Sequence, residues 1–463
     1  MFTSHTVSKA IGMTSVLRIA CRLLSVLLVA LPFARGAQAA DQLPSYIRDA
    51  EIESALRLFY TPIFEAAGLD PTVVHVYIVS DPQLNSFVAG GQNVFINTGT
   101  IMRSESPNQL VGIVAHETGH IAGGHLIRSE QAMKEATIKS IIAMVVGAGA
   151  AAASGNAGAA PAAILGGQGV GMRSFLTFSV AQEATADQAA LTYLDKTHQS
   201  ARGLLEFFQI LEGQEVLSAA RQSPYLRTHP LTSQRIDNMR EHVEHSPYSN
   251  VADPPAWVEL HKRMKAKLIA FLNPLDYTLQ QFPPSDTSVA ARYARAVAYY
   301  RVPELKKALE QIDGLIQQEP DNPYFNELKG QMLFENGRIA DAVAPYKESV
   351  RLAPDVALLH VELGQVEIET GDASLTKDAL GHLKSAIRFE ARNPDAWHFL
   401  AIAYGRTGDL GNSALAQAEE AMAQGDKVQA RGLAQRAIKL LPAGSPGRLR
   451  AEDIEMEAAR KKE

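Results

Sequence analysis

Two different periods of hydrophobic and polar positions follow each other in the first hundred residues. Residues 45–68 carry apolar side chains at helical spacing and end at a glycine, which predicts an amphipathic helix. The runs 73–80 and 92–100 are short and rich in β-branched and aromatic residues, and Asp-Pro and Gly-Gly pairs bracket them, so they predict strands. A small sheet is therefore expected after the first helix.

The helical period returns after residue 105. Ser106 offers an N-cap, Pro107 suits the first helical position and Gln109 follows at the third, so a helix is predicted to start here and to continue through "VAHETGHIAGGH" at 114–125. A further helix is predicted over 179–196, where apolar residues again recur at helical spacing.

Residues 136–172 consist almost wholly of alanine, glycine and small aliphatic residues. Ser154, Gly155 and Asn156 interrupt the longest apolar stretch too early for it to span a bilayer. We expect a flexible lid or a buried hairpin here, and a membrane-dipping hairpin with peripheral membrane contact remains the alternative.

A repeat occupies the C-terminal part of the chain. Its units start at a proline, contain two predicted helices and place a glycine in the turn between them, and Pro320 and Pro354 set a 34-residue period. This period predicts tetratricopeptide repeats, which stack into a curved solenoid with a binding face; an ordinary helical bundle is the alternative. The interval from Pro354 to the next repeat proline, Pro394, is longer because of a short insertion near 373–378. The charged tail 450–463 predicts a final helix.

The length of 463 residues implies more than one core, and a proline-rich stretch separates the two patterns. We predict an α+β fold class, with a mainly helical domain that contains a small β-sheet followed by an all-α tetratricopeptide solenoid. The predicted parts are a removed signal peptide at 1–40, the first domain at 41–250, a connecting helix and linker at 251–287, and the repeats at 288–463.

Net charge and cysteine content limit the classes of function and the kinds of metal ligand that this chain can have. A formal charge of −6 gives no sign of a nucleic-acid surface. Basic residues precede the apolar run 23–33, and Ala37 and Ala39 form an A-x-A cleavage site, which indicates an export signal and, most simply, a periplasmic location. The single cysteine, Cys21, lies inside this signal, so a metal in the mature chain must be held by His, Asp or Glu.

The segment "HETGH" carries the candidate chemistry. On a helix, residues four apart share a face, so His116 and His120 can bind one metal ion while Glu117 projects beside it as a general base. A third histidine in the H-E-x-x-H-x-x-G-x-x-H pattern would fall at Leu126. His125 comes one residue early, so it is expected to have a structural role or to contact a side chain that binds the metal.

A carboxylate from another helix is the natural third ligand. "QEATAD" offers Glu183, with Asp187 one turn later on the same face, where it could accept a hydrogen bond from a ligand histidine. The alternative is a solvated acidic helix face.

Together, the signal, this motif, the glycine-rich insert, "EATAD", "THPLTSQRI" at 228–236 and the repeats resemble the BepA-type periplasmic metalloproteases, within the zincin family that includes HtpX and the CAAX prenyl endopeptidases. The resemblance implies a zincin domain with one Zn²⁺ per chain, which His116, His120 and Glu183 would bind, and Glu117 as catalytic base. The family's H-P-x-x-x-x-R segment corresponds to His229, Pro230 and Arg235, and Val180 departs from the residue that members often carry.

Three protein ligands would leave a metal position open for the water that attacks the substrate. His229 has two possible roles: it could donate a hydrogen bond to the developing oxyanion, or it could bind the zinc as a fourth ligand and keep the enzyme latent. We expect His229 and residues 136–172 to control access to the site.

Substrate is expected to pair with the strand in "GGQNVFINTGT", because an extended backbone can bind unfolded chains without regard to their sequence. An internal strand without a free edge is the alternative. The expected substrate-binding residues are Asn93, Val94, Phe95, Ile96 and Asn97.

These patterns predict a periplasmic zinc endopeptidase that cleaves unfolded or misassembled proteins. The resemblance implies that its clients and partners are outer-membrane proteins and their assembly machinery, which the repeats would bind. The competing prediction is a non-catalytic chaperone or adaptor with a structural or latent zinc, and Glu117 argues against it because a structural site needs no base.

Overall fold

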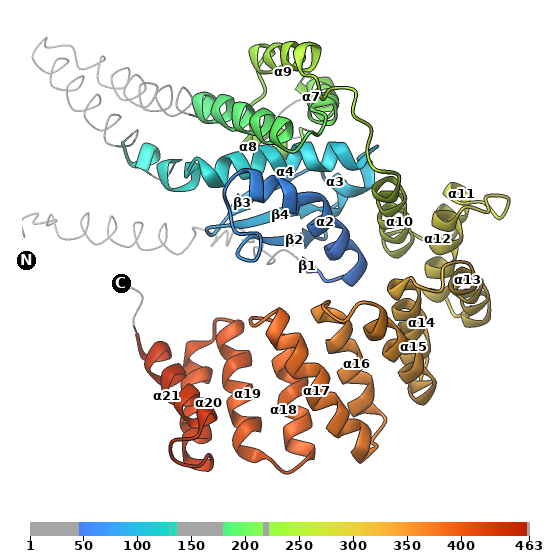
Figure 1. Ribbon diagram of the computed structural model, residues 1–463, viewed down its shortest axis with the longest axis vertical. Helices are drawn as coiled ribbons and strands as arrows, with labels where there is room; N and C mark the ends of the chain where they lie inside the picture. The colour runs from blue at the N-terminus through green and yellow to red at the C-terminus, as the bar shows by residue number, and fades with distance from the viewer. Residues whose placement is uncertain (1–45, 130, 136, 138–178, 216–221, 461–463) are drawn as a thin grey trace, which may run out of the picture. The chain divides into compact units, whose positions relative to one another are not determined.

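The computed structural model describes residues 46–129, 131–135, 137, 179–215 and 222–460 (Figure 1). The predicted signal peptide and nearly all of the segment 136–172 lie outside these residues.

A four-stranded sheet forms the β part, in the order β1-β2-β4-β3. β2 and β4 are parallel, and the two outer strands pair antiparallel to them. Strands are found within both predicted runs, as β2 and β4, but the second run was predicted too long, since residues 98–100 start α3. Residues 46–47 form β1, and the first helix starts only at Ala50, because Asp49 caps it by accepting a hydrogen bond from the Ile52 amide. The strands are β1 (Tyr46–Ile47), β2 (His75–Val79), β3 (Ser86–Ala89) and β4 (Asn93–Asn97).

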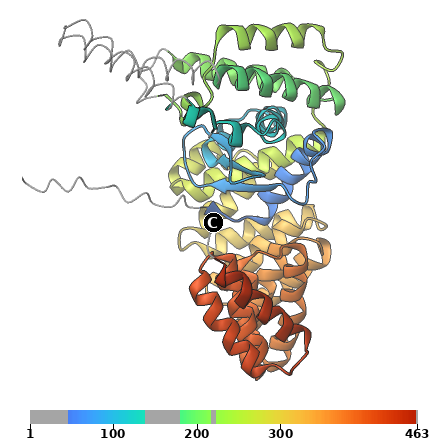
Figure 2. The same cartoon turned by 90° about the vertical axis from the view of Figure 1, so that its left-hand side faces the viewer.

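Helices cover the sheet, and α4 lies between the sheet and the helix of residues 179–196 (Figures 1 and 2). The predicted start of α4 is confirmed: Ser106 Oγ accepts a hydrogen bond from the Gln109 amide, and Pro107 occupies the first turn. The other helices of this part are α2 (Ala50–Ala66), α3 (Thr98–Arg103), α7 (Arg202–Glu215), α8 (Pro224–Thr228) and α9 (Ser233–His245), and α4 spans Pro107–Ala122.

The segment expected to be a connecting helix and linker, 251–287, contains a helix that packs into two cores. α10 (Pro255–Leu272) places Met264 and Leu268 in the core of the first part. Ala266 and Ala270 of the same helix lie in the core that α12 and α13 form. α10 therefore belongs to both cores, and α11 (Leu275–Gln281) follows it.

Helix pairs follow, as the repeat predicted. Gly330 and Gly364 occupy equivalent positions, and a Cβ on either would come within 2.7 Å of Tyr346 or Leu383 on the paired helix, so glycine allows the helices of a pair to approach closely. The insertion near 373–378 lengthens α17 instead of forming a loop. The helices are α12 (Val289–Tyr300), α13 (Leu305–Gln318), α14 (Pro323–Glu335), α15 (Ile339–Leu352), α16 (Ala357–Glu369), α17 (Ala373–Phe389), α18 (Pro394–Arg406), α19 (Leu410–Ala423), α20 (Lys427–Leu440) and α21 (Pro446–Ala459).

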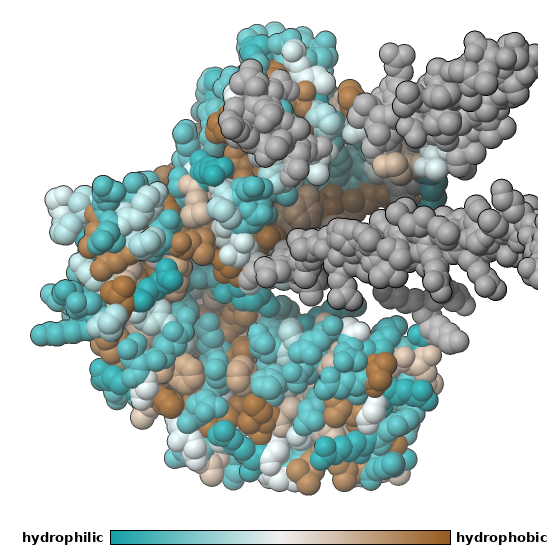
Figure 3. All heavy atoms as spheres, turned by 180° about the vertical axis from the view of Figure 1, so that it is seen from behind, coloured by the Kyte–Doolittle hydropathy of each residue, from teal (hydrophilic) through white to brown (hydrophobic). Residues whose placement is uncertain are grey.

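The predicted fold class, a mainly helical domain with a small sheet followed by all-α repeats, is confirmed. Among the described helices, none has the length and apolar character needed to cross a membrane. On the face shown in Figure 3, hydrophobic residues form separate patches within a largely hydrophilic surface.

Candidate metal centre

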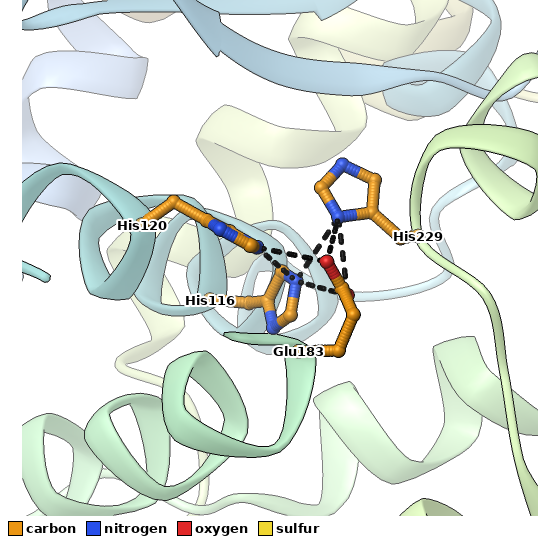
Figure 4. Close-up of side chains that lie close together, drawn as sticks. All are labelled: His116, His120, Glu183 and His229. Atoms are coloured by element: carbon orange, nitrogen blue, oxygen red, sulfur yellow. Dashed lines mark hydrogen bonds and ion pairs between the residues drawn. The ribbon is translucent and has the colours of Figure 1, made fainter. Parts of the chain in front are cut away.

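The centre begins with two histidines on one face of α4. His116 is fully buried, His120 is 6% exposed, and their Nε2 atoms lie 3.1 Å apart. The four-residue spacing on a helix accounts for this convergence. Figure 4 shows both imidazoles turned toward the same point.

Glu183 reaches this point from the helix of residues 179–196. Its carboxylate oxygens lie 3.4 Å from Nε2 of His116 and 3.4 Å from Nε2 of His120. The two helices can approach because Gly119 of α4 faces the backbone of Ala186, where a Cβ would come within 2.8 Å of the Ala186 carbonyl oxygen. Gly119, the residue directly before the final motif histidine, thus determines whether the glutamate can reach the histidines.

His229 joins the cluster from the residue that follows α8. Its Nδ1 lies 3.2 Å from both carboxylate oxygens of Glu183 and 3.4 Å from Nε2 of His116 (Figure 4). The short helix is fixed at its start by Ser223, whose side chain accepts a hydrogen bond from the Leu226 amide. The His229 amide donates the last backbone hydrogen bond of this helix to the Tyr225 carbonyl, which positions the His229 backbone at the end of the helix.

The geometry of these four side chains fits a metal ion. One ligand atom from each of His116, His120, Glu183 and His229 lies within 4.8 Å of the others, and all four residues are buried. Ligands at the corners of a tetrahedron with bonds of about 2.0–2.1 Å lie about 3.3 Å apart, close to the separations found here. Imidazole nitrogens that face one another and a carboxylate at such distances need a cation among them.

A second group of side chains holds the ligands. His116 Nδ1 lies 2.9 Å from Asp187 Oδ1, a contact that favours the proton on Nδ1 and leaves Nε2 to face the cluster. Arg235 donates to both oxygens of Asp187, at 2.6 and 2.8 Å, and its Nη1 lies 3.1 Å from Glu183. His125 Nδ1 lies 2.9 Å from His120 Nδ1, so His125 contacts the outer nitrogen of a cluster member and does not face the centre.

The charges of the site favour a cation at its centre. Burial opposes a charge on His116, but Asp187 and Glu183 outweigh it and raise the pKa of His116 to about 9. Burial and the neighbouring His116 lower the pKa of His120 to about 2. Burial also opposes ionisation of Glu183, yet its contacts with His116 and His229 hold its pKa well below the ordinary value. The field that retains a proton on His116 would equally stabilise a metal ion.

Glu117 lies beside the cluster and not in it. It is fully buried, and neither carboxylate oxygen accepts a hydrogen bond from the described residues. Burial raises the pKa of Glu117 above its ordinary value. Its Oε1 lies 3.7 Å from Nε2 of His229, the nitrogen that points away from Glu183. A buried carboxylate without a donor is costly, which is typical of a group kept for chemistry.

The strand that was expected to bind substrate, β4, lies inside the sheet. β4 pairs with β2 on one side and β3 on the other, so the expectation that a peptide pairs directly with Asn93–Asn97 is wrong. The short run of β-branched and aromatic residues after the Gly-Gly pair predicted the strand but carried no information on its neighbours. Among the described strands, β1 and β3 lie at the two edges of the sheet, and β3 contacts α4.

Tyr225 is the site residue that the motifs missed. Its ring stacks on His229 at a centroid distance of 4.5 Å, and its hydroxyl is buried and has no hydrogen-bond partner among the described residues. Burial raises the pKa of this hydroxyl well above its ordinary value. The four-residue spacing between Tyr225 and His229 was the available signal, but it identifies a stacked pair only when the segment is known to be helical.

Comparison with known proteins agrees with this site, because residues 48–243 match peptidase family M48. These residues are an M48 peptidase domain. The chain is therefore a metalloprotease.

Two relatives match this chain over more residues than the M48 domain contains. The chain is 23% identical to the beta-barrel assembly-enhancing protease of Yersinia pestis over 380 residues, which cover 81% of this chain and 76% of that one. It is 27% identical to the putative beta-barrel assembly-enhancing protease of Vibrio cholerae over 258 residues, or 54% and 52% of the two chains. The predicted resemblance to this class of metalloproteases is confirmed.

A solved structure described as YrrB, a TPR protein with an unusual peptide-binding site, is 14% identical and covers 38% of this chain and 91% of its own, with a TM-score of 0.31.

Proposed function

We propose that the protein is a zinc-dependent endopeptidase that cleaves unfolded or misassembled polypeptides. The observation that supports this most directly is Glu117, a buried carboxylate that accepts no hydrogen bond from the described part of the chain and lies beside four side chains arranged as metal ligands. Histidine and carboxylate ligands without cysteine, at tetrahedral separations, favour zinc among the common metals.

A zinc ion held by His116, His120 and Glu183 would act as a Lewis acid that polarises the peptide carbonyl and makes water more acidic. Glu117 accepts the proton of the attacking water and then delivers it to the leaving amine. Its raised pKa suits both steps, because a base that is too weak could not take the proton and one that is too strong could not release it. Asp187 and Arg235 keep His116 and Glu183 in position.

Of the two possible roles of His229, oxyanion donor and fourth zinc ligand, its position favours the second. Its Nδ1 faces Glu183 and His116 as closely as the other ligand atoms face one another. Four protein ligands leave no position for water, so we propose that this arrangement is a latent form. When the His229 side chain moves out of the cluster, its imidazole is free to donate a hydrogen bond to the reacting oxygen.

The substrate is proposed to pair with β3, an edge strand of the described part of the sheet. β3 contacts α4, so an extended peptide that pairs with β3 through main-chain hydrogen bonds would lie close to the helix that carries His116 and His120. Phe87 of β3 stacks on Phe95 of β4 at 4.9 Å, so the strand is held firmly against the sheet. Such pairing supports the cleavage of many unfolded sequences.

The names of the relatives support a place for the enzyme in outer-membrane protein assembly, where it would remove misassembled chains. We propose a periplasmic location after removal of residues 1–40, and partners that bind the repeats. The proposed extent of the peptidase part is 41–250, with the connecting helix at 251–287 and the repeats from 288. Contact of residues 136–172 with a membrane surface, or their action as a lid, is part of the same proposal.

The test compares cleavage of casein and of a misfolded outer-membrane protein by the unaltered mature chain, Glu117→Gln and chelator-treated protein. We expect cleavage by the unaltered chain, a loss of at least about 100-fold in Glu117→Gln with stoichiometric zinc retained, and restoration of the chelated protein by zinc. Equal cleavage by all three would refute the proposal. A four-ligand closed site also suits a non-catalytic adaptor, which would be inactive in all three samples and would stay inactive when His229 is replaced by alanine.

A further inference from the structure

A small recess lies in the repeats between α17, α18 and α19. Its volume is about 230 Å³, below the roughly 300–1,000 Å³ typical of pockets that enclose a whole small molecule, so it suits one side chain. Leu400 and Ala416 are buried in its lining, while Ile387, Trp397 and Leu415 are only partly covered and remain open to a ligand.

The aromatic walls of the recess are fixed. Trp397 donates its indole N–H to the carbonyl of Ala391 at 2.9 Å, so the polar edge of its ring is already satisfied. Tyr404 lies two turns further along the same helix and lines the recess as well. A ligand would therefore meet rigid apolar surface, which reduces the entropy lost on binding.

One cation lies at this apolar surface. Lys384 of α17 lines the recess, is exposed, and holds its ammonium 5.4 Å from the centre of the Tyr404 ring. Within the part of the chain that the structure describes, Lys384 makes no ion pair and no acidic side chain lines the recess. Asn412, the other polar residue of the lining, already donates its amide to Asp409 at 2.7 Å.

An apolar recess with a lysine and no carboxylate selects a ligand with an apolar group directly beside a negative charge. A polypeptide carries both on a single residue only at its C-terminus, where the side chain and the free carboxylate share one Cα. We propose that this recess binds the apolar C-terminal residue of a polypeptide, with the side chain between Trp397 and Leu415 and the carboxylate on Lys384.

This inference deepens the proposed function and rests on it in one respect, the choice of a polypeptide as the ligand. It gives the repeats a means to recognise chain ends, including the new C-terminus that each cleavage creates. Binding is measured in a catalytically silent protein, so the result does not depend on whether the metal centre cleaves the chain.

The chain has two tryptophans, so Trp397 can serve as a single reporter. Trp257 packs on Phe59 in the peptidase part, and phenylalanine can replace it there with little disturbance. Glu117→Gln/Trp257→Phe is titrated with acetylated hexapeptides that end in phenylalanine with a free carboxylate, in phenylalanine amide, or in alanine with a free carboxylate. We expect a saturable change in Trp397 fluorescence with the first peptide, and binding about tenfold weaker for each of the others.

Lys384→Gln tests the lysine, and Lys377→Gln provides a matched control on the same helix outside the recess. Lys384→Gln should abolish the preference for the free carboxylate without changing the affinity for the amide, and Lys377→Gln should retain the preference. Circular dichroism verifies that each variant is folded.

Equal affinity for acid and amide peptides in the parent protein, an unchanged Trp397 signal at millimolar peptide, or the same loss in both lysine variants would overturn the proposal. Decanoate serves as an acyl probe, and tighter binding of decanoate than of the phenylalanine peptide would also overturn it, in favour of a lipid ligand.

Discussion

Arg235 joins two carboxylates that act on different sides of the metal centre. It donates to both oxygens of Asp187, which lies behind His116, and it contacts Glu183 within the cluster. All three charged groups are at least nine-tenths buried, so the arrangement depends on complete pairing. A planar guanidinium can make these contacts at once, whereas an ammonium cannot.

We expect Arg235→Ala to weaken zinc binding by about 10-fold to 100-fold, because Asp187 and Glu183 lose the group that holds them apart and in place. Arg235→Lys should fall between this variant and the parent. Competition with a fluorescent zinc chelator measures the affinity. Arg240→Ala is the control, since Arg240 lies exposed on the same helix and pairs with Asp237. Loss of zinc in both variants would mean that α9, and not the Arg235 contacts, determines the affinity.

At the scale of elements, the spacing of two helices decides whether a ligand reaches the metal. Gly119 permits α4 and the helix of residues 179–196 to come together at Ala186, next to Glu183. An added methyl group would meet backbone, which cannot turn aside as a flexible side chain could.

Gly119→Ala should therefore lower the free energy of unfolding by roughly 1–3 kcal/mol and reduce zinc affinity, although alanine is the better helix former. Denaturation by urea and zinc titration measure the two effects. Gly213→Ala in α7 is the control, because a Cβ there meets no atom within 4 Å. It should be neutral or slightly stabilising. A stable, zinc-binding Gly119→Ala would show that the helices tolerate a wider separation.

A buried acid in the repeats gives a pH dependence of stability. Glu367 of α16 is fully buried, with Lys347 of α15 3.3 Å away and His382 of α17 3.9 Å away. Burial raises the pKa of Glu367 to about 7, and Lys347 opposes this only in part. The folded protein thus binds a proton that the unfolded chain releases near pH 4.5, so this group favours folding at low pH and its contribution is lost as the pH rises toward 7.

Glu367→Gln should remove this dependence. We expect the variant to exceed the parent in stability by roughly 1–3 kcal/mol at pH 8 and by little at pH 5, as measured by urea denaturation at both values. Glu310→Gln, at an exposed position of α13, should show no such difference. The same gain at pH 5 and pH 8 would contradict the assignment.

On the scale of the whole molecule, a buried cluster of charges connects the peptidase part to the repeats. Lys267 of α10 is 1% exposed and lies 2.8 Å from Asp49 and 3.6 Å from Glu327 of α14. Burial opposes its charge, but Asp49 and Glu327 keep the pKa of Lys267 well above its ordinary value. Ala50, the first residue of α2, packs in the core that α15 and α16 form.

Lys267→Met should cost about 3–5 kcal/mol, since it leaves buried carboxylates without their cation. Asp49→Asn and Glu327→Gln in the same chain should recover much of this loss. Thermal unfolding followed by circular dichroism gives the stability. Failure of the triple variant to recover would attribute the loss to packing and not to charge.

The sequence alone determined the parts of the molecule that depend on local spacing. Four-residue steps placed His116 with His120 and Glu183 with Asp187, and a 34-residue period identified the repeats, because both are properties of a regular helix. A short run of β-branched and aromatic residues after a Gly-Gly pair likewise located β4.

Only the tertiary structure decided which distant residues meet. It placed His229 among the ligand atoms and Tyr225 against it, brought two helices together at Gly119, and put β4 inside the described sheet and β3 at its edge. These contacts join segments far apart in the chain, and they depend on how closely whole helices and strands pack. The local period of hydrophobic residues does not determine how closely two helices or strands pack.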